Sequence, residues 1–107
     1  MAVKHVVLLK FKKDTSADKI KEIFGTLAGL RGRIRGLLDF AGGPYSGSEG
    51  LGRGYTHGFV MTFQDAACRD LYLPDPAHKA VVDLLLPELD GGVNGVLAFD
   101  WDYNPAH

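Results

Sequence analysis

A tyrosine, an aspartate, a proline and a histidine fall within seven residues in the second half of the chain, at Tyr72, Asp75, Pro76 and His78. An Asp-Pro pair is a strong helix start, because aspartate can cap free backbone N–H groups and proline has its φ preset for the first helical position. The pair predicts that His78 lies in the first turn of a helix and that Tyr72 ends the preceding one. We expect chemistry where this imidazole and this phenol meet.

His78 could act as a general base, because the dipole of its helix disfavours the charged ring and leaves a neutral ring that can accept a proton. Tyr72 could donate a hydrogen bond to a developing enolate or carbonyl oxygen. Each residue also has a structural interpretation. The His78 ring could cap a local backbone carbonyl, and Tyr72 could end a helix with its hydroxyl in water.

Two further histidines, His5 and His57, each take the third position of a predicted strand. We expect these strands to be parallel neighbours, which would place the two rings side by side at one end of a pocket. At least one ring should then be neutral, because two buried charged imidazoles repel each other. They could equally be core histidines with satisfied hydrogen bonds. A metal would need a third ligand such as His78 or Asp75, and nothing in the spacing requires one, so no metal is expected.

Composition narrows the class of protein. The chain has 107 residues, which predicts a single domain over 1–107. A net charge of −1 argues against a nucleic-acid partner, because such proteins usually carry a concentrated basic excess. We expect no membrane span and no signal peptide. The single cysteine, Cys68, cannot form an internal disulfide, and we expect an inert thiol in a cytoplasmic protein.

Hydrophobic periodicity predicts four strands and three helices. Side chains of alternating polarity, bounded by turn residues, give strands at 3–13, 37–45, 55–63 and 93–103. Helical spacing gives a helix at about 17–31, a short one at 66–73 and a third from the Asp-Pro pair to about 86. The glycine-rich segment 42–54 lacks the Lys-Ser/Thr ending of a phosphate-binding loop, so no nucleotide cofactor is expected.

This order of elements predicts an α+β fold of the ferredoxin-like type, βαββαβ, with an antiparallel sheet and both long helices on one face. The first and third strands should be central neighbours. The opposite face would carry apolar side chains that no helix covers: Val6, Leu8, Val60 and either Leu97 or Trp101. An apolar face of that size implies a partner, and the simplest one is a second copy related by a two-fold axis.

The chain also resembles a known family. The opening Met-Ala-Val-Lys-His strand, the Gly-Tyr-Thr-His strand from Gly54, the Pro-Ala-His segment from Pro76 and the closing Phe99-Asp100 pair resemble the stress-responsive dimeric α/β-barrel proteins, and among them a plant polyketide cyclase. The resemblance implies two ferredoxin-like subunits joined sheet to sheet as a homodimeric barrel, each with a pocket between its sheet and its helices.

In the cyclase, residues matching Tyr72 and His78 serve an intramolecular aldol condensation, and His5 and His57 match further pocket positions. The sequence departs from the cyclase pattern at Asp75, where the cyclase has a histidine, and at Leu27, where it has an aromatic residue.

Two classes of function therefore stay open. One is a cofactor-free cyclase or lyase acting on a small, partly apolar, enolisable carbonyl compound, with His78 as base and Tyr72 as hydrogen-bond donor. The other is a non-catalytic stress or small-molecule-binding dimer. In both, the pocket walls are expected to include two further histidines and five apolar residues: His5, His57, Val7, Leu9, Phe24, Phe59 and Met61.

Overall fold

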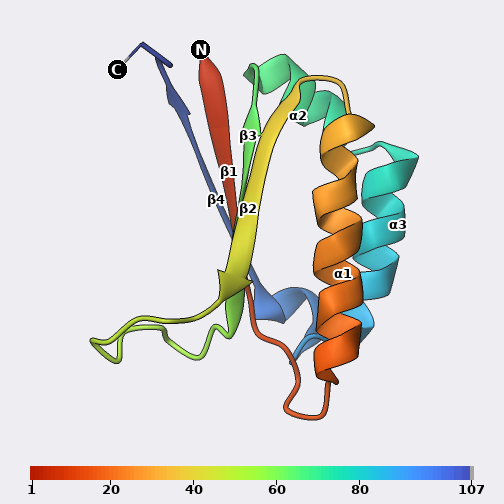
Figure 1. The fold of residues 1–107 in the computed structure, drawn as a ribbon, viewed down its shortest axis with the longest axis vertical. Helices are drawn as coiled ribbons and strands as arrows, with labels where there is room; N and C mark the ends of the chain where they lie inside the picture. The colour runs from red at the N-terminus through yellow and green to blue at the C-terminus, as the bar shows by residue number, and fades with distance from the viewer. Residues whose placement is uncertain (107) are drawn as a thin grey trace.

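A four-stranded antiparallel sheet carries its helices on one face, as Figure 1 shows for the computed structural model, which describes residues 1–106. The strand order β2-β3-β1-β4 makes the first and third strands central neighbours, as the sequence predicts. The strands are β1 (Ala2–Leu9), β2 (Leu37–Pro44), β3 (His57–Phe63) and β4 (Val96–Tyr103).

The helices begin and end close to the residues that the sequence indicates. Ser16 caps the first helix by accepting a hydrogen bond from the Lys19 N–H, and Asp65 caps the second. The α-helices are α1 (Ala17–Gly29), α2 (Ala66–Tyr72) and α3 (Pro76–Leu85). Short 3₁₀ turns follow α1 and α3 and precede β4, at Leu30–Gly32, Leu86–Glu88 and Gly92–Gly95.

The predicted strands are longer than the observed ones at four ends, by a single residue at the end of the second strand, which stops at Pro44. The first strand stops at Leu9 rather than Lys13, because the Lys10 and Lys12 N–H groups donate to Gly95 and Glu88 carbonyls outside the sheet. The third strand begins at His57, and the last begins at Val96 because the 3₁₀ turn takes the residues before it.

The core fills the space between the helices and the inner sheet face. Its side chains come from alternate positions of β1 and β3 and from one stripe of each helix. The members that are completely buried are Val3, Leu9, Ile23, Met61 and Phe63. A rigid core of this kind fixes the positions of the polar side chains that share the inner face.

The outer sheet face has no helix over it (Figure 1). Phe99 and Trp101 of β4 are 62% and 46% exposed there, and Leu97 is 39% exposed. The expected uncovered apolar face is therefore present, with Phe99 as its most exposed aromatic residue. No helix among residues 1–106 is long and apolar enough to span a membrane.

Candidate active site

A cavity of about 270 Å³ lies between the inner sheet face and the helices, and it contains the Tyr72–His78 pair. Its volume is just below the usual range of small-molecule pockets. Three of the residues that line it carry polar side-chain groups, namely His5, Tyr72 and His78. The complete lining has fourteen residues: His5, Val7, Leu27, Phe59, Tyr72, Leu73, His78, Val81, Val82, Leu85, Leu86, Val93, Val96 and Ala98. The cavity is therefore apolar, with a few polar atoms that could orient a ligand.

Local structure brings Tyr72 and His78 together. Tyr72 is the last residue of α2, and Asp75 starts α3 by accepting a hydrogen bond from the Ala77 N–H at 2.8 Å, with Pro76 as the first helical residue. This tight connection places the two rings edge to face, with centroids 4.6 Å apart. The helix start predicted from the Asp-Pro pair is confirmed.

The hydrogen bond of the His78 ring identifies its tautomer. His78 Nδ1 lies 2.7 Å from the backbone carbonyl oxygen of Leu73. A carbonyl oxygen only accepts hydrogen bonds, so Nδ1 carries the proton and donates. In the neutral ring Nε2 is then unprotonated and can accept a proton. The structural interpretation, in which the ring caps a carbonyl, is thus compatible with a role as base.

Tyr72 remains a phenol over the whole physiological pH range. The residue is only 2% exposed, and burial, followed by the nearby charge of Asp75, raises the pKa of its hydroxyl to about 12. Both causes penalise the phenolate. None of the side-chain hydrogen bonds of residues 1–106 uses this hydroxyl, so Tyr72 has a proton to donate to a ligand oxygen.

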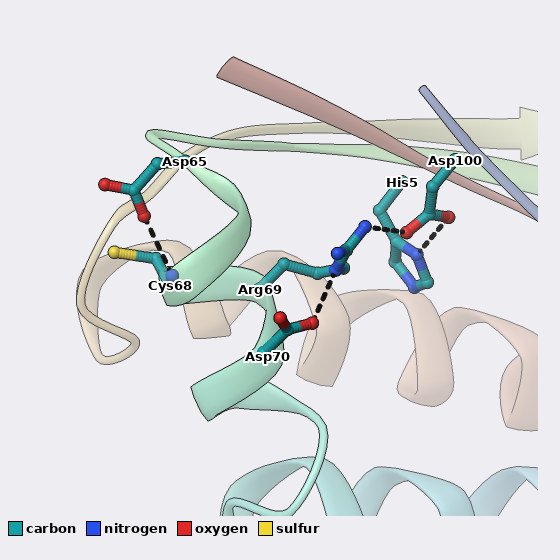
Figure 2. A network of polar contacts seen from close by, with 6 residues as sticks. All are labelled: His5, Asp65, Cys68, Arg69, Asp70 and Asp100. Carbon is teal, nitrogen blue, oxygen red and sulfur yellow. Dashed lines mark hydrogen bonds and ion pairs between the residues drawn. The ribbon is translucent and has the colours of Figure 1, made fainter. Parts of the chain in front are cut away.

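The third polar residue of the cavity, His5, belongs to a charged network (Figure 2). Its Nδ1 lies 2.8 Å from Asp100 Oδ1, across the β1–β4 pair. The other carboxylate oxygen, Oδ2, accepts a hydrogen bond from Arg69 Nη1 at 3.0 Å, and Arg69 Nε donates to Asp70 at 3.0 Å. These bonds, to Asp70 first and to Asp100 second, raise the pKa of Arg69, which stays charged.

Sequence reasoning missed Arg69 and Asp100. A signal for Asp100 was present, because the alternation of β4 places this charged residue on the inner face with Val96 and Ala98. A carboxylate on an inner face needs a partner. Arg69 gave no such signal, because a short helix does not indicate which of its residues reaches the sheet.

The expected pairing of His5 with His57 is wrong. Strands β1 and β3 are antiparallel, so His5 lies opposite Met61 and His57 lies opposite Leu9, at the other end of the strand pair. His57 instead contacts Phe11 and Phe24, with ring centroids 5.0 and 5.7 Å away. Burial lowers the pKa of His57 below the ordinary 6.5. Burial among aromatic rings, rather than a second imidazole, therefore favours the neutral form of His57.

Four of the expected wall residues lie elsewhere. Leu9 and Met61 are fully buried in the core, and Phe24 and His57 line a separate surface hollow at the N-terminal end of α1. The cavity wall does contain Val7 and Phe59, together with the three polar residues. The remaining wall comes largely from α3 and the residues just before and within β4, which the sequence did not assign to it.

No group of three His, Cys, Asp or Glu side chains within residues 1–106 is arranged to hold a metal ion. The arrangement that is present combines one acceptor nitrogen, His78 Nε2, with one phenolic donor in an apolar cavity. These are the groups that proton abstraction next to a carbonyl requires, with a donor for the oxygen on which charge develops.

Comparison with known proteins identifies similar chains. A family model described as the stress responsive A/B barrel domain matches residues 3–103. The stress-response A/B barrel domain-containing protein HS1 of Arabidopsis thaliana is 36% identical over 88 residues, 82% of this chain and 81% of its own. Olivetolic acid cyclase of Cannabis sativa is 32% identical over 84 residues, 78% of this chain and 83% of its own.

Among solved structures, a dimeric ferredoxin-like protein from Jannaschia sp. CCS1 superposes with a TM-score of 0.88. It is 30% identical, and the match covers 96% of this chain and all of the other. The fold predicted from the element order is therefore confirmed as ferredoxin-like.

Proposed function

This chain belongs to the stress-responsive A/B barrel domain family, and on that premise we propose that it is a cofactor-free cyclase or lyase acting on a small enolisable carbonyl compound. One observation carries the proposal. In a single apolar cavity, His78 has an Nδ1 that donates to the Leu73 carbonyl and Tyr72 has a hydroxyl held as the neutral phenol.

The proposed reaction needs only these two side chains. His78 Nε2 takes a proton from the carbon next to a carbonyl, and Tyr72 donates a hydrogen bond to the resulting enolate oxygen. The enolate carbon then attacks a second carbonyl of the same molecule, which forms a carbon–carbon bond and an alkoxide. The alkoxide takes the proton back from the His78 imidazolium, so the enzyme returns to its starting state.

The cavity wall supports this chemistry because water would reprotonate the enolate. Apart from its three polar residues, the wall is apolar and comes from helices α1 and α3, Leu73, the inner sheet face and the 3₁₀ turns. An enolate formed inside would be shielded from bulk water. The apolar wall also favours a substrate that carries a hydrocarbon portion next to its carbonyl groups.

The similarity to olivetolic acid cyclase supports a cyclase reaction. The two residues at which the sequence differs from the cyclase pattern, Asp75 and Leu27, have different places in the structure. Asp75 serves as the N-cap of α3, so it positions His78 without lining the cavity. Leu27 does line the cavity, where it leaves more room than an aromatic side chain. The substrate is therefore expected to differ in shape from that of the cyclase.

The protein is proposed to act as a homodimer through its outer sheet face. The Jannaschia relative is a dimeric protein, and the outer face of this chain exposes Phe99, Trp101 and Leu97 without a covering helix. Burying this face against a second copy would remove the exposed aromatic surface from water. We place the dimer in the cytoplasm, which suits the free, buried thiol of Cys68.

The alternative function is a dimeric binding protein without catalysis, in which the same cavity holds an apolar carbonyl compound. Incubating the full chain with a panel of poly-β-keto and other enolisable carbonyl compounds separates the two, with products followed by mass spectrometry. Cyclised or cleaved products that need His78 support the enzyme. Saturable binding without product formation supports the binding protein and contradicts the proposed reaction.

A further inference from the structure

The His5–Asp100–Arg69 network contains a residue that no step of the proposed reaction uses. His5 is 8% exposed and its Nδ1 lies 2.8 Å from Asp100 Oδ1. An ionised carboxylate only accepts hydrogen bonds, so Nδ1 carries a proton. In the neutral ring the other nitrogen, Nε2, is consequently bare.

The unprotonated nitrogen, His5 Nε2, faces the cavity. No buried side-chain nitrogen or oxygen of residues 1–106 lacks a hydrogen-bond partner, and the side-chain hydrogen bonds of His5 within these residues involve Nδ1 alone. His5 Nε2 therefore borders open space, and for a ring that is almost completely buried that space is the cavity it lines. A ligand group at this position must donate a hydrogen bond.

Whether His5 stays neutral depends on how much of the Asp100 charge it experiences. A carboxylate paired with a buried imidazole favours the protonated ring, which would present an N–H to the cavity instead of a lone pair. Here the carboxylate is shared, because Arg69 Nη1 occupies its second oxygen at 3.0 Å. Arg69 places a fixed positive charge one carboxylate away from His5, and like charges disfavour the imidazolium.

Tyr72 and His78 share the cavity with the His5 ring, and three further groups lie beside the ring or its carboxylate partner. Asp100 faces it from β4, Arg69 reaches it from α2 through Asp100, and Phe63 of β3 contacts its edge with ring centroids 6.3 Å apart. Asp70, the other partner of Arg69, has a side chain that is 64% exposed, so solvent screens its effect on the network.

We propose that Arg69 is a positioning residue that acts through the shared carboxylate of Asp100, keeps His5 as the neutral Nδ1–H tautomer, and so makes His5 Nε2 a hydrogen-bond acceptor for an enol or phenol hydroxyl of the ligand. The proposal rests on the proposed function in taking the cavity as the ligand site. It adds that the ligand brings an O–H donor to the sheet side of the cavity.

The test measures the state of His5 directly. ¹⁵N-labelled full-length protein at about pH 7 is studied by long-range ¹H–¹⁵N correlation NMR, which distinguishes the Nδ1–H tautomer, the Nε2–H tautomer and the imidazolium. Wild type is expected to show the neutral Nδ1–H tautomer. Arg69→Met is expected to show a larger imidazolium fraction, and Arg69→Lys, which keeps the charge, is expected to restore the wild-type spectrum.

Phenol and its methyl ether, anisole, serve as ligand probes of nearly equal size. Phenol is expected to shift the ¹⁵N resonance of His5 Nε2 in wild type, because its hydroxyl donates to that nitrogen, whereas anisole has no proton to donate. In Arg69→Met the shift on adding phenol should be smaller, since part of the population has an N–H at that position.

Arg31→Met is the matched control, because the Arg31 guanidinium makes only an exposed contact of 3.8 Å with Asp39. It should leave the His5 spectrum unchanged. If Arg69→Met does not fold, as judged by circular dichroism, Arg69→Gln replaces it. The proposal is overturned if wild-type His5 is the Nε2–H tautomer or the imidazolium. It is also overturned if neither Arg69→Met nor Arg69→Gln changes the charge state of His5. A change of equal size in Arg31→Met would overturn it too.

These outcomes are separable from the fate of the proposed reaction. A protein with the expected His5 spectrum that converts no carbonyl compound would contradict the cyclase or lyase and leave the role of Arg69 intact. Turnover by a protein whose His5 is charged at neutral pH would contradict the role of Arg69 alone.

Discussion

The rings of Tyr72 and His78 meet edge to face at 4.6 Å between centroids, with their planes inclined by 62°. The contact joins the last residue of α2 to the first turn of α3. The hydrogen bond from His78 Nδ1 to the Leu73 carbonyl fixes the orientation of the His78 ring. A phenolic donor and an unprotonated imidazole nitrogen are thus held in one place by the main chain between two helices, before any ligand binds.

Removing either group of this pair is expected to lower turnover while the protein stays folded. His78→Ala removes the base and should reduce the rate by about 10²–10⁴. Tyr72→Phe removes one donor to the enolate oxygen and should cost about 10²–10³. Rates are measured on a substrate that the wild type converts, with Lys79→Ala, an exposed α3 neighbour, as control. Full activity in both site variants would refute these roles.

The Tyr72 hydroxyl should ionise at a higher pH than the hydroxyl of an ordinary tyrosine. Its pKa is raised to about 12 from the usual 10.0 by burial and by Asp75, so the folded state keeps a proton that the unfolded state loses between these values. Stability from this residue is present below about pH 10 and is lost as the pH rises toward 12, by about 2–3 kcal/mol in total. Ultraviolet titration of wild type minus Tyr72→Phe isolates the transition. A Tyr72 midpoint at the ordinary value would contradict the burial argument.

His57 should make the protein sensitive to acid. Because burial lowers its pKa below 6.5, the unfolded state binds a proton more readily than the folded state. The free energy of unfolding should therefore fall as the pH drops below about 6.5. His57→Phe, which keeps an aromatic ring beside Phe11 and Phe24, should show a smaller loss between about pH 7.5 and pH 5. Urea unfolding at fixed protein concentration measures both. Equal losses in the two proteins would show that His57 is not the sensor.

Asp75→Ala should affect both stability and the site. It removes the 2.8 Å hydrogen bond to the Ala77 N–H that caps α3, which typically costs about 1 kcal/mol. The first turn of α3 carries His78, so turnover or ligand binding should fall as well. Ser16→Ala removes the corresponding cap of α1 and should cost a similar free energy with the cavity unchanged. An equal loss of binding in both variants would mean that Asp75 acts only through global stability.

A charge on the outer sheet face should prevent dimer formation. Phe99 is 62% exposed on that face, so Phe99→Lys should leave each subunit folded but yield a monomer in light scattering at micromolar concentration. Leu71→Lys changes a residue that is 69% exposed on helix α2 and should leave the dimer intact. A folded wild-type monomer under the same conditions would end the dimer proposal.

Local sequence patterns determine much of the architecture. Alternating apolar residues locate the four strands, the Asp75–Pro76 pair starts α3, and the βαββαβ order identifies the fold that the structure has. These features depend on neighbours within a few residues, so the sequence alone determines them. For the same reason it determines the Tyr72–His78 pair, whose two members are six residues apart.

Tertiary structure alone decides the rest of the site. His5 and Asp100 lie 95 residues apart and meet at 2.8 Å only because β1 and β4 pair in one register. The antiparallel pairing of β1 with β3 moves His57 away from His5 and into contact with Phe24 of α1. Strand direction and register are set by how the whole chain buries its apolar faces, so no local pattern reveals which distant side chains will touch.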